Sequence, residues 1–244
     1  MLAREEMIAL AFKYQGDYAL IRKAILANEK IEARSYQNCV VIYDEHYPKL
    51  LYQLAQAPFV LFYEGNLKLL NQKTIGMIGS RKACAYALSE TQKLIERLEA
   101  EQVVVSGLAL GIDGYAHACA LTHCKTLAVL GHGLDMIYPK ANEKLYHRIK
   151  NEGLLISEYP PGTPIRKHQF VHRNRIIAAL SNVLCVMQAQ IKSGTMSTVE
   201  YALSLGIEIY ALPYHVDEVE GSGCNLLIQQ GASLLTSTTD LFKL

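Results

Sequence analysis

Glycine and serine recur in four short segments that each follow an apolar run, and two of these segments carry a cation. The segments are Gly79-Ser80-Arg81, Ser106-Gly107, Gly131-His132-Gly133 and Lys192-Ser193-Gly194-Thr195. Glycine lets the backbone approach a ligand closely, and the start of a following helix offers N–H groups and partial positive charge to phosphate oxygens. A single segment of this kind is more often only a tight turn. Taken together, and with Arg81 and Lys192, they favour an anionic ligand.

The second candidate site is a basic stretch, residues 164–175, which reads PIRKHQFVHRNR. It has no acidic residue, and it contains Arg166, Lys167, His168, Phe170, His172, Arg173 and Arg175. Cations that hold phosphates, together with an aromatic ring that stacks on a base, are how proteins bind single-stranded nucleic acid. The alternative is a solvated basic loop with Phe170 in the core, because runs of charge often mean only solvent exposure.

Several familiar catalytic patterns are missing from the sequence. It has no G-x-x-x-x-G-K-[ST] phosphate loop and no G-x-S-x-G nucleophile elbow. Asp113 and His117 lie four residues apart on a predicted helix and could bind a metal, but a helix cap at Asp113 and a structural hydrogen bond at His117 fit the pattern better. The six cysteines form no C-x-x-C pair, which indicates free thiols in a reducing cytosol. We expect no catalytic residue, no metal and no cofactor.

Overall composition limits the kind of binding protein this chain can be. Its 244 residues are half apolar and carry a formal net charge of only +1. A strongly basic charge, the usual sign of a nucleic-acid-binding protein, is absent, so any charge that holds DNA must be local. No window reaches the roughly 18 apolar residues that span a bilayer, and charges interrupt the N-terminal apolar stretch, which argues against a secretory signal. We expect a cytoplasmic protein that does not bind a membrane.

Apolar runs alternate with helical stretches from about residue 39 onward. The runs are residues 39–44, 59–65, 74–80, 103–107, 126–131, 154–158, 183–189 and 208–213. They are apolar without alternation, which is typical of parallel strands buried on both faces, whereas residues 87–101 have helical spacing. This order predicts an α/β fold with a Rossmann-like, doubly wound, mostly parallel sheet. Ligands bind such sheets at the carboxyl ends of the strands, where the glycine-rich segments lie.

The chain is expected to have two parts. Residues 1–35 are predicted to be a small N-terminal helical segment, in which Gly16-Asp17 separates two short helices within residues 3–28. Residues 36–244 are predicted to be an extended Rossmann-like DNA-binding domain.

The motifs jointly resemble the DprA/Smf (DNA-processing A) family. The matching stretches are IGSR (78–81), VVSGLALGIDGYAH (104–117), TLAVLGHGLDMIYPKAN (126–142), LLISEYPPGTP (154–164), FVHRNRIIAALS (170–181), KSGTMST (192–198) and GCNLLIQQGA (223–232). Their order and spacing extend over about residues 42–238, so the resemblance is far more specific than any one motif.

The resemblance implies a homodimeric, non-catalytic protein that binds and protects single-stranded DNA and loads the RecA recombinase during natural transformation. The DNA-binding positions of the family correspond to Arg81, Lys140, Lys167, Phe170, Arg173, Asn174 and Arg175. The glycine-rich segments add Gly79, Ser80, Ser106, Gly107, Lys192, Ser193 and Gly194 as expected contacts. Lys140 follows Tyr138-Pro139 and depends most on the resemblance, and Asn142 is expected to brace the same loop.

The sequence departs from the family pattern in several places. Gln188 stands where many members have glutamate, and Tyr214 follows Pro213 where members often have glycine. The N-terminal part is shorter than the sterile-alpha-motif-like domain of some members, and we expect no C-terminal winged-helix domain such as others carry.

A second hypothesis is a nucleotide-binding enzyme or sensor of the lysine-decarboxylase-like Rossmann type. In that family a P-G-G-x-G-T-x-x-E motif supplies a catalytic acid. Residues 192–200, KSGTMSTVE, match this motif only loosely, and Glu200 would be the catalytic acid. Release of base from a nucleoside monophosphate would indicate the enzyme, and mononucleotide binding that outcompetes oligonucleotides would indicate the sensor.

Overall fold

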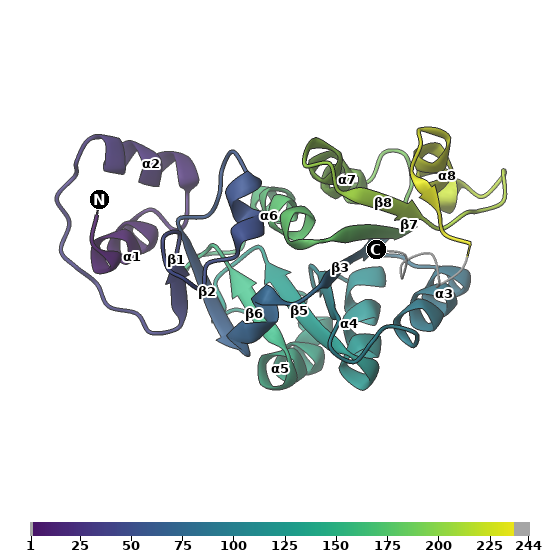
Figure 1. Ribbon diagram of the computed structural model, residues 1–244, viewed down its shortest axis with the longest axis horizontal. Helices are drawn as coiled ribbons and strands as arrows, with labels where there is room; N and C mark the ends of the chain where they lie inside the picture. The colour runs from purple at the N-terminus through teal and green to yellow at the C-terminus, as the bar shows by residue number, and fades with distance from the viewer. Residues whose placement is uncertain (1, 237–244) are drawn as a thin grey trace.

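The computed structural model describes residues 2–236, and within them the chain forms a nine-stranded sheet with helices on both faces (Figure 1). The strand order is β1-β2-β6-β5-β4-β3-β7-β8-β9. The strands are β1 (Cys39–Val41), β2 (Val60–Gly65), β3 (Thr74–Gly79), β4 (Val103–Ser106), β5 (Lys125–Leu130), β6 (Leu154–Ser157), β7 (Val183–Gln188), β8 (Glu208–Ala211) and β9 (Ser233–Leu234). The expected α/β fold is confirmed, and β9 is a strand that the sequence pattern did not predict.

The sheet is mostly parallel, as expected. All neighbours from β6 to β9 pair in parallel, whereas β1 and β2 add an antiparallel edge. The central strands are largely apolar because both of their faces are covered; every residue of β4 and β7 is buried. The chain proceeds from β3 through β4 and β5 to β6 in one direction and then returns to place β7 on the other side of β3. The strand order therefore reverses between β3 and β7.

Helices cover the two faces of the sheet in separate groups (Figure 1). One face carries α3 (Ala85–Ile95), α4 (Ile112–His123) and α5 (Glu143–Glu152), and the other carries α6 (Lys167–Leu180), α7 (Gly194–Ser204) and α8 (Ser222–Gln229). Short 3-10 helices lie in the connecting segments: η1 (Lys49–Gln53), η2 (Leu67–Asn71), η3 (Lys140–Asn142) and η4 (Val219–Gly221). None of the helices in residues 2–236 has the length and apolar character to cross a membrane.

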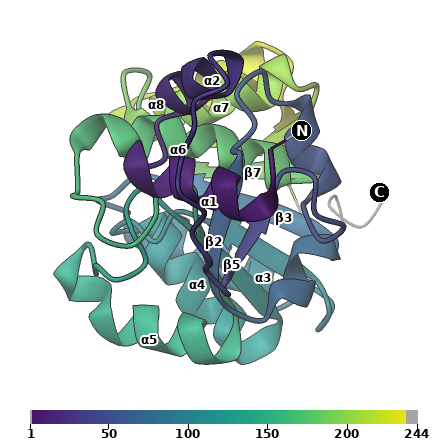
Figure 2. The ribbon, with the colours of Figure 1, turned by 90° about the vertical axis from the view of Figure 1, so that its left-hand side faces the viewer.

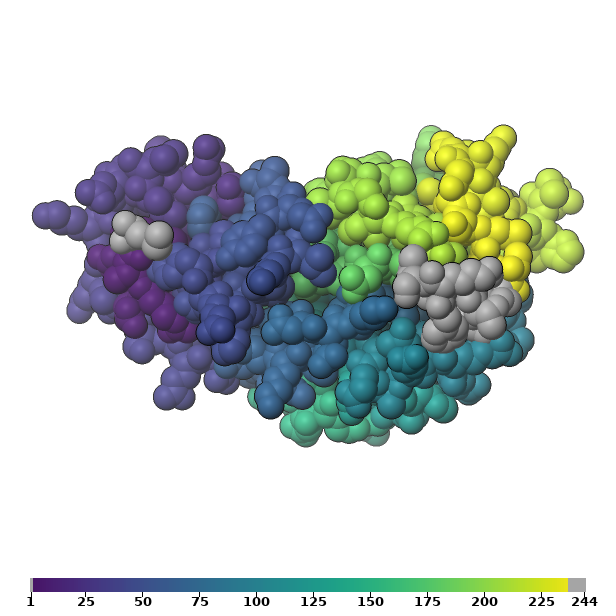
Figure 3. All heavy atoms as spheres, in the orientation of Figure 1, coloured from purple at the N-terminus to yellow at the C-terminus, as the bar shows by residue number. Residues whose placement is uncertain are grey.

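The N-terminal segment contains α1 (Arg4–Lys13) and α2 (Tyr18–Leu26), which the turn at Gly16 separates as expected. It has no core of its own. Its buried residues, such as Ile8 and Leu10, share one apolar cluster with Phe62 of β2 and Leu155 of β6. The segment lies at one end of the elongated molecule, over the antiparallel edge (Figures 2 and 3). The segment therefore packs directly against the sheet.

Candidate nucleic-acid interface

A pocket of about 720 Å³ lies between the loops that follow β3 and β7, where the strand order reverses. This is the position at which open α/β sheets bind ligands. The lining includes many of the candidate residues: Gly79, Ser80, Arg81, Phe170, Arg173, Asn174, Ser193 and Gly194. We call this space the switch-point pocket.

Two exposed cations, Arg81 and Lys82, form one rim of the switch-point pocket. The loop that carries them is held in place by α4, because the Ile112 N–H donates to the Ser80 carbonyl at 3.1 Å. Gly111 has a φ of 75°, and a Cβ there would lie 2.7 Å from the carbonyl carbon of Arg81, so only glycine allows this close approach. The fold thus fixes the backbone beneath both cations.

The start of α7 forms the opposite wall. Ser193 is its N-cap residue, and the buried Ser193 Oγ has no partner within residues 2–236. Apart from the chain neighbours of Gly194 and the backbone of its own helix, no described atom lies within 4 Å of the position that a Cβ on Gly194 would take, so the space beside the start of this helix is open. The first N–H groups of a helix lack intrahelical partners. This wall therefore offers donors and partial positive charge to an anion.

Phe170 of α6 brings an aromatic ring to the pocket. It is half-buried, and its ring centroid lies 5.3 Å from that of Tyr138 and 6.2 Å from that of His132. Tyr138 is 48% exposed, so the ring pair reaches the surface rather than lying wholly in the core. Two residues further, the Lys140 side chain is 77% exposed, with its Nζ 3.8 Å from Glu143 Oε1. Tyr138 and Lys140 lie outside the pocket lining, and Tyr138 connects their loop to the pocket through its contact with Phe170.

Arg173, expected as a DNA-binding residue of an exposed basic stretch, is instead buried in the floor of the pocket. It is 4% exposed, and its Nη1 donates to the carbonyls of Gly107 and Val129. Burial lowers the pKa of Arg173 to about 10, against the effect of the nearby Asp113 carboxylate. Burial likewise raises the pKa of Asp113, against the effect of the Arg173 charge. Arg173 therefore supports the loop after β4 from beneath.

Ser106 and Gly107 were also expected to contact DNA, but both are buried. The Ser106 Oγ donates to the Met77 carbonyl at 2.6 Å. The Gly107 N–H donates to Asp113 Oδ2 at 3.2 Å, and the Arg173 guanidinium occupies the place where a Cβ on Gly107 would lie. These groups shape the floor and have no donor left for a strand of DNA.

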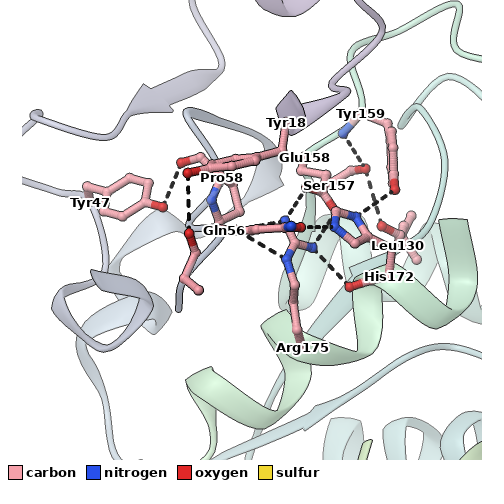
Figure 4. A network of polar contacts seen from close by, with 11 residues as sticks. Tyr18, Tyr47, Gln56, Pro58, Leu130, Ser157, Glu158, Tyr159, His172 and Arg175 are labelled. Carbon is pink, nitrogen blue, oxygen red and sulfur yellow. Dashed lines mark hydrogen bonds and ion pairs between the residues drawn. The ribbon is translucent and has the colours of Figure 1, made fainter. Parts of the chain in front are cut away.

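The structure corrects most clearly the expectation that Arg175 binds DNA, because its guanidinium is paired with a buried carboxylate. Its Nη1 and Nη2 donate to Glu158 Oε1 and Oε2 at 2.7 and 2.6 Å, and both side chains are 3% exposed (Figure 4). The Arg175 Nε and Nη2 also donate to the Gln56 carbonyl. Burial opposes ionisation of Glu158, yet the Arg175 charge lowers the pKa of Glu158 to about 2. Arg175 is therefore a structural residue that joins α6 to the end of β6.

The remaining candidates lie around the pocket rather than in it. Lys167, the first residue of α6, and Lys192, next to Ser193, are both exposed and lie outside the pocket lining. Asn174 is in the lining, and its Nδ2 donates to Ser197 Oγ at 2.9 Å, which ties α6 to α7.

The polar pair Asp113 and His117 has structural partners. Gly111, not Asp113, is the N-cap residue of α4, and the Asp113 carboxylate instead accepts from the Gly107 N–H of the preceding loop. The His117 Nδ1 lies 2.6 Å from Thr126 Oγ1, and burial lowers the pKa of His117 to about 3, so it is neutral at physiological pH. Asn142 braces its loop as expected, because its Nδ2 donates to the Leu108 and Ala109 carbonyls.

Sequence reasoning missed Lys82 and Tyr138 as candidates in this region. Lys82 lines the pocket, as does Thr195 of the fourth glycine-rich segment, and Tyr138 contacts Phe170. Lys82 follows Arg81 directly, so its position in the same loop was the available signal. Tyr138 gave no signal of its own, because only the fold brings it to Phe170. Glu200, the acid of the enzymatic hypothesis, is exposed on α7 and is not part of the lining.

Comparison with known proteins identifies the family that this chain resembles. The model of the family described as DNA recombination-mediator protein A matches residues 38–244. The DNA processing protein DprA of Streptococcus pneumoniae is 44% identical over 201 residues, which cover 82% of this chain and 71% of that protein. DprA of Bacillus subtilis is 36% identical over 84% of this chain and 70% of its own length. Protein Smf of Synechocystis is 39% identical, and the match covers 51% of its length.

Two solved structures share the fold at meaningful sequence identity. The X-ray structure of DprA from Streptococcus pneumoniae superposes with a TM-score of 0.82 at 36% identity, over 99% of this chain and 93% of that one. DNA processing protein A from Helicobacter pylori, whose structure was described for its single-stranded DNA binding mode, superposes with a TM-score of 0.77 at 32% identity. That match covers 85% of this chain and 95% of the other.

Proposed function

Because this chain belongs to the DNA recombination-mediator protein A family, we propose that it binds single-stranded DNA in the switch-point pocket. The backbone of the strand crosses the carboxyl ends of β3 and β7. Arg81 and Lys82 pair with phosphates on one side, the start of α7 donates hydrogen bonds on the other, and a base stacks on Phe170. Lys140, Lys167 and Lys192 add positive charge on the approaches.

One observation supports this proposal above the others. The switch-point pocket combines exposed cations, an open helix start and a half-buried aromatic ring in one space. A phosphate alone would need only the first two features. A ring beside them suits a nucleotide, and stacking of one base contributes about 1–3 kcal/mol. Phosphate contacts carry no sequence information, so we expect little sequence preference.

The proposal is tested by titrating the protein against labelled oligothymidylate and a duplex of equal length over a salt series. We expect the single strand to bind more tightly, because its bases are free to stack. The logarithm of its affinity should fall with the logarithm of salt concentration by about 0.7 per phosphate contact. Equal affinity for both strand forms, or an affinity independent of salt, would contradict the proposal.

We extend the proposal to the loading of RecA onto single-stranded DNA in the cytoplasm during natural transformation. The family description as a recombination mediator supports this role. RecA has a DNA-dependent ATPase, and its onset measures how fast RecA assembles on the strand. The chain should shorten that onset, and an unchanged onset would count against the role.

We further propose that the chain forms a homodimer, which would let two pockets hold one strand and raise its avidity. Among residues 2–236, β9 is an edge strand of the sheet, and edge strands favour association. Apolar side chains are exposed on β9, on α7, on η4 and on the loop before η4. They include Leu203, Val216, Val219 and Leu234. Sedimentation equilibrium should give twice the chain mass, and a monomer at micromolar concentration would refute the dimer.

A further inference from the structure

We propose that a second groove, between the N-terminal helical segment and α6, is a further binding subsite for the same DNA strand. This inference rests on the function proposed for the switch-point pocket. It gives the N-terminal segment a direct role: the segment forms the outer wall of a continued nucleic-acid path.

The groove encloses about 730 Å³ and lies directly beside the switch-point pocket. Residues 13–20 form one wall, and α6 with the residue before it forms the other. The first half of α6 separates the two spaces: Phe170 and Asn174 line the pocket, whereas His168 and His172 line the groove. Residues four apart share a helix face, which explains this division. Val171, which is 51% exposed, lines both spaces and joins them.

One cation of the groove lining is positioned to bind a phosphate. Arg166 is exposed, and its Nη2 lies 3.5 Å from Gln15 Oε1, at the limit of a hydrogen bond. Lys13 is less available, because its Nζ pairs with Glu29 Oε1 at 2.7 Å. The acidic residue of the lining, Asp17, accepts from the Leu20 N–H as the N-cap of α2. Arg166 is thus the cation best placed to bind an anion.

Aromatic side chains provide surfaces on which a base can stack. Tyr18 lines the groove, and its ring stacks on Phe59 with centroids 5.0 Å apart and planes inclined by 10°. The Tyr18 hydroxyl donates to the Ala55 carbonyl at 3.3 Å, which helps to hold the ring in one orientation. A ring fixed before binding loses little conformational freedom when a base stacks on it.

The base of the groove is a connected polar network (Figure 4). The His172 Nε2 lies 3.0 Å from Gln56 Oε1, and its Nδ1 lies 3.3 Å from Glu158 Oε1 and 3.4 Å from the Tyr159 hydroxyl. Glu158 is in turn held by Arg175. The network therefore fixes His172 and the α6 wall relative to the loop after β6.

The outer wall is docked closely as well. Gly16 has a φ of 75°, and a Cβ there would lie 2.6 Å from the Glu158 carbonyl oxygen and 3.1 Å from the Tyr159 ring. Only glycine lets the turn between α1 and α2 approach the loop after β6 so closely. The groove is therefore preformed, and binding need not order the N-terminal segment.

The test compares Arg166→Ala with the wild-type protein on oligothymidylates of about 4 to 20 nucleotides, a range that brackets the about 4–16 nucleotides covered by single-strand-binding folds. We expect the shortest strands to bind both proteins equally. On long strands Arg166→Ala should lose several-fold in affinity, and its salt slope should fall by about 0.7. Lys68→Ala, which removes an exposed cation from η2 at the opposite edge of the sheet, should behave like the wild type at every length.

A second variant tests the outer wall itself. Gln15→Glu places a carboxylate beside Arg166 from the N-terminal segment, and it should reproduce the loss on long strands. Wild-type behaviour of both variants at every length, or equal losses on short and long strands, would overturn the second subsite. Failure of the wild-type protein to bind any strand would instead refute the proposed function, and this inference with it.

Discussion

Arg81→Glu should weaken binding of single-stranded DNA by about 10- to 100-fold. Arg81 is an exposed cation at the rim of the switch-point pocket, and a hydrogen bond to a charged group is worth roughly 1.5–3 kcal/mol. Each 1.4 kcal/mol is tenfold in affinity, and the new carboxylate adds repulsion from the phosphates. Fluorescence anisotropy with a labelled oligothymidylate at several salt concentrations measures both the affinity and its salt slope, which should become shallower.

The matched control for this change is Lys68→Glu. It makes the same charge reversal on an exposed residue of η2, which precedes β3 and so lies at the opposite edge of the sheet. We expect its affinity to remain within about twofold of the wild type at moderate salt, where the Debye length of about 10 Å screens distant charges. Equal losses in the two variants would mean that only total charge matters, and the pocket would lose its role.

Arg175→Met should lower the free energy of unfolding by about 3–5 kcal/mol, because it leaves the buried Glu158 carboxylate without its partner. Urea unfolding at neutral pH measures this loss. The double variant Arg175→Met with Glu158→Leu should recover much of the stability, since it removes the uncompensated charge together with its partner. If Arg175 instead contacts DNA directly, the single variant will lose affinity while its unfolding curve stays close to that of the wild type.

The same ion pair predicts a pH dependence of stability. The pKa of Glu158 is lowered to about 2 in the folded protein from an ordinary 4.5. The unfolded chain therefore binds the proton more readily, and the pair's stabilisation is fully present above about pH 4.5. It should be lost, by a few kcal/mol, as the pH falls toward 2. The Glu158→Gln variant should show a flatter decline in this interval, and an identical decline would contradict the role of the pair.

The sheet was the most predictable part of the molecule. Strands β3 to β8 are short apolar runs because both of their faces are buried, and that pattern is visible in the sequence. The predicted helix at residues 87–101 is shorter in the structure, where α3 ends at Ile95. The strand β9 has two residues, too few for any pattern.

The parts of the site that could be predicted are the loops whose glycine, serine and cationic residues directly follow a strand. Gly79-Ser80-Arg81 and Ser193-Gly194 follow strands, so their location at the carboxyl edge follows from the parallel order. The return of β7 to the side of β3 is a long-range choice, and it alone brings these two loops to one pocket.

The burial of Arg173 and Arg175 could not be predicted from the basic stretch at residues 164–175. Both lie in a run of cations that suggests solvent exposure, yet both are buried. Their partners come from distant segments: Glu158 for Arg175, and the carbonyls of Gly107 and Val129 for Arg173. A local pattern cannot distinguish an arginine that faces such a partner from one that faces solvent.

The claim that the switch-point pocket holds single-stranded DNA is tested most directly by photo-crosslinking. An oligothymidylate that contains 4-thiothymidine is irradiated with the protein, and the crosslinked peptides are identified by mass spectrometry. We predict crosslinks at residues 80–82, 170, 171, 173, 174 and 193–195, which line the pocket. Crosslinks confined to other surfaces, such as the opposite edge of the sheet around residues 67–73, would contradict the account.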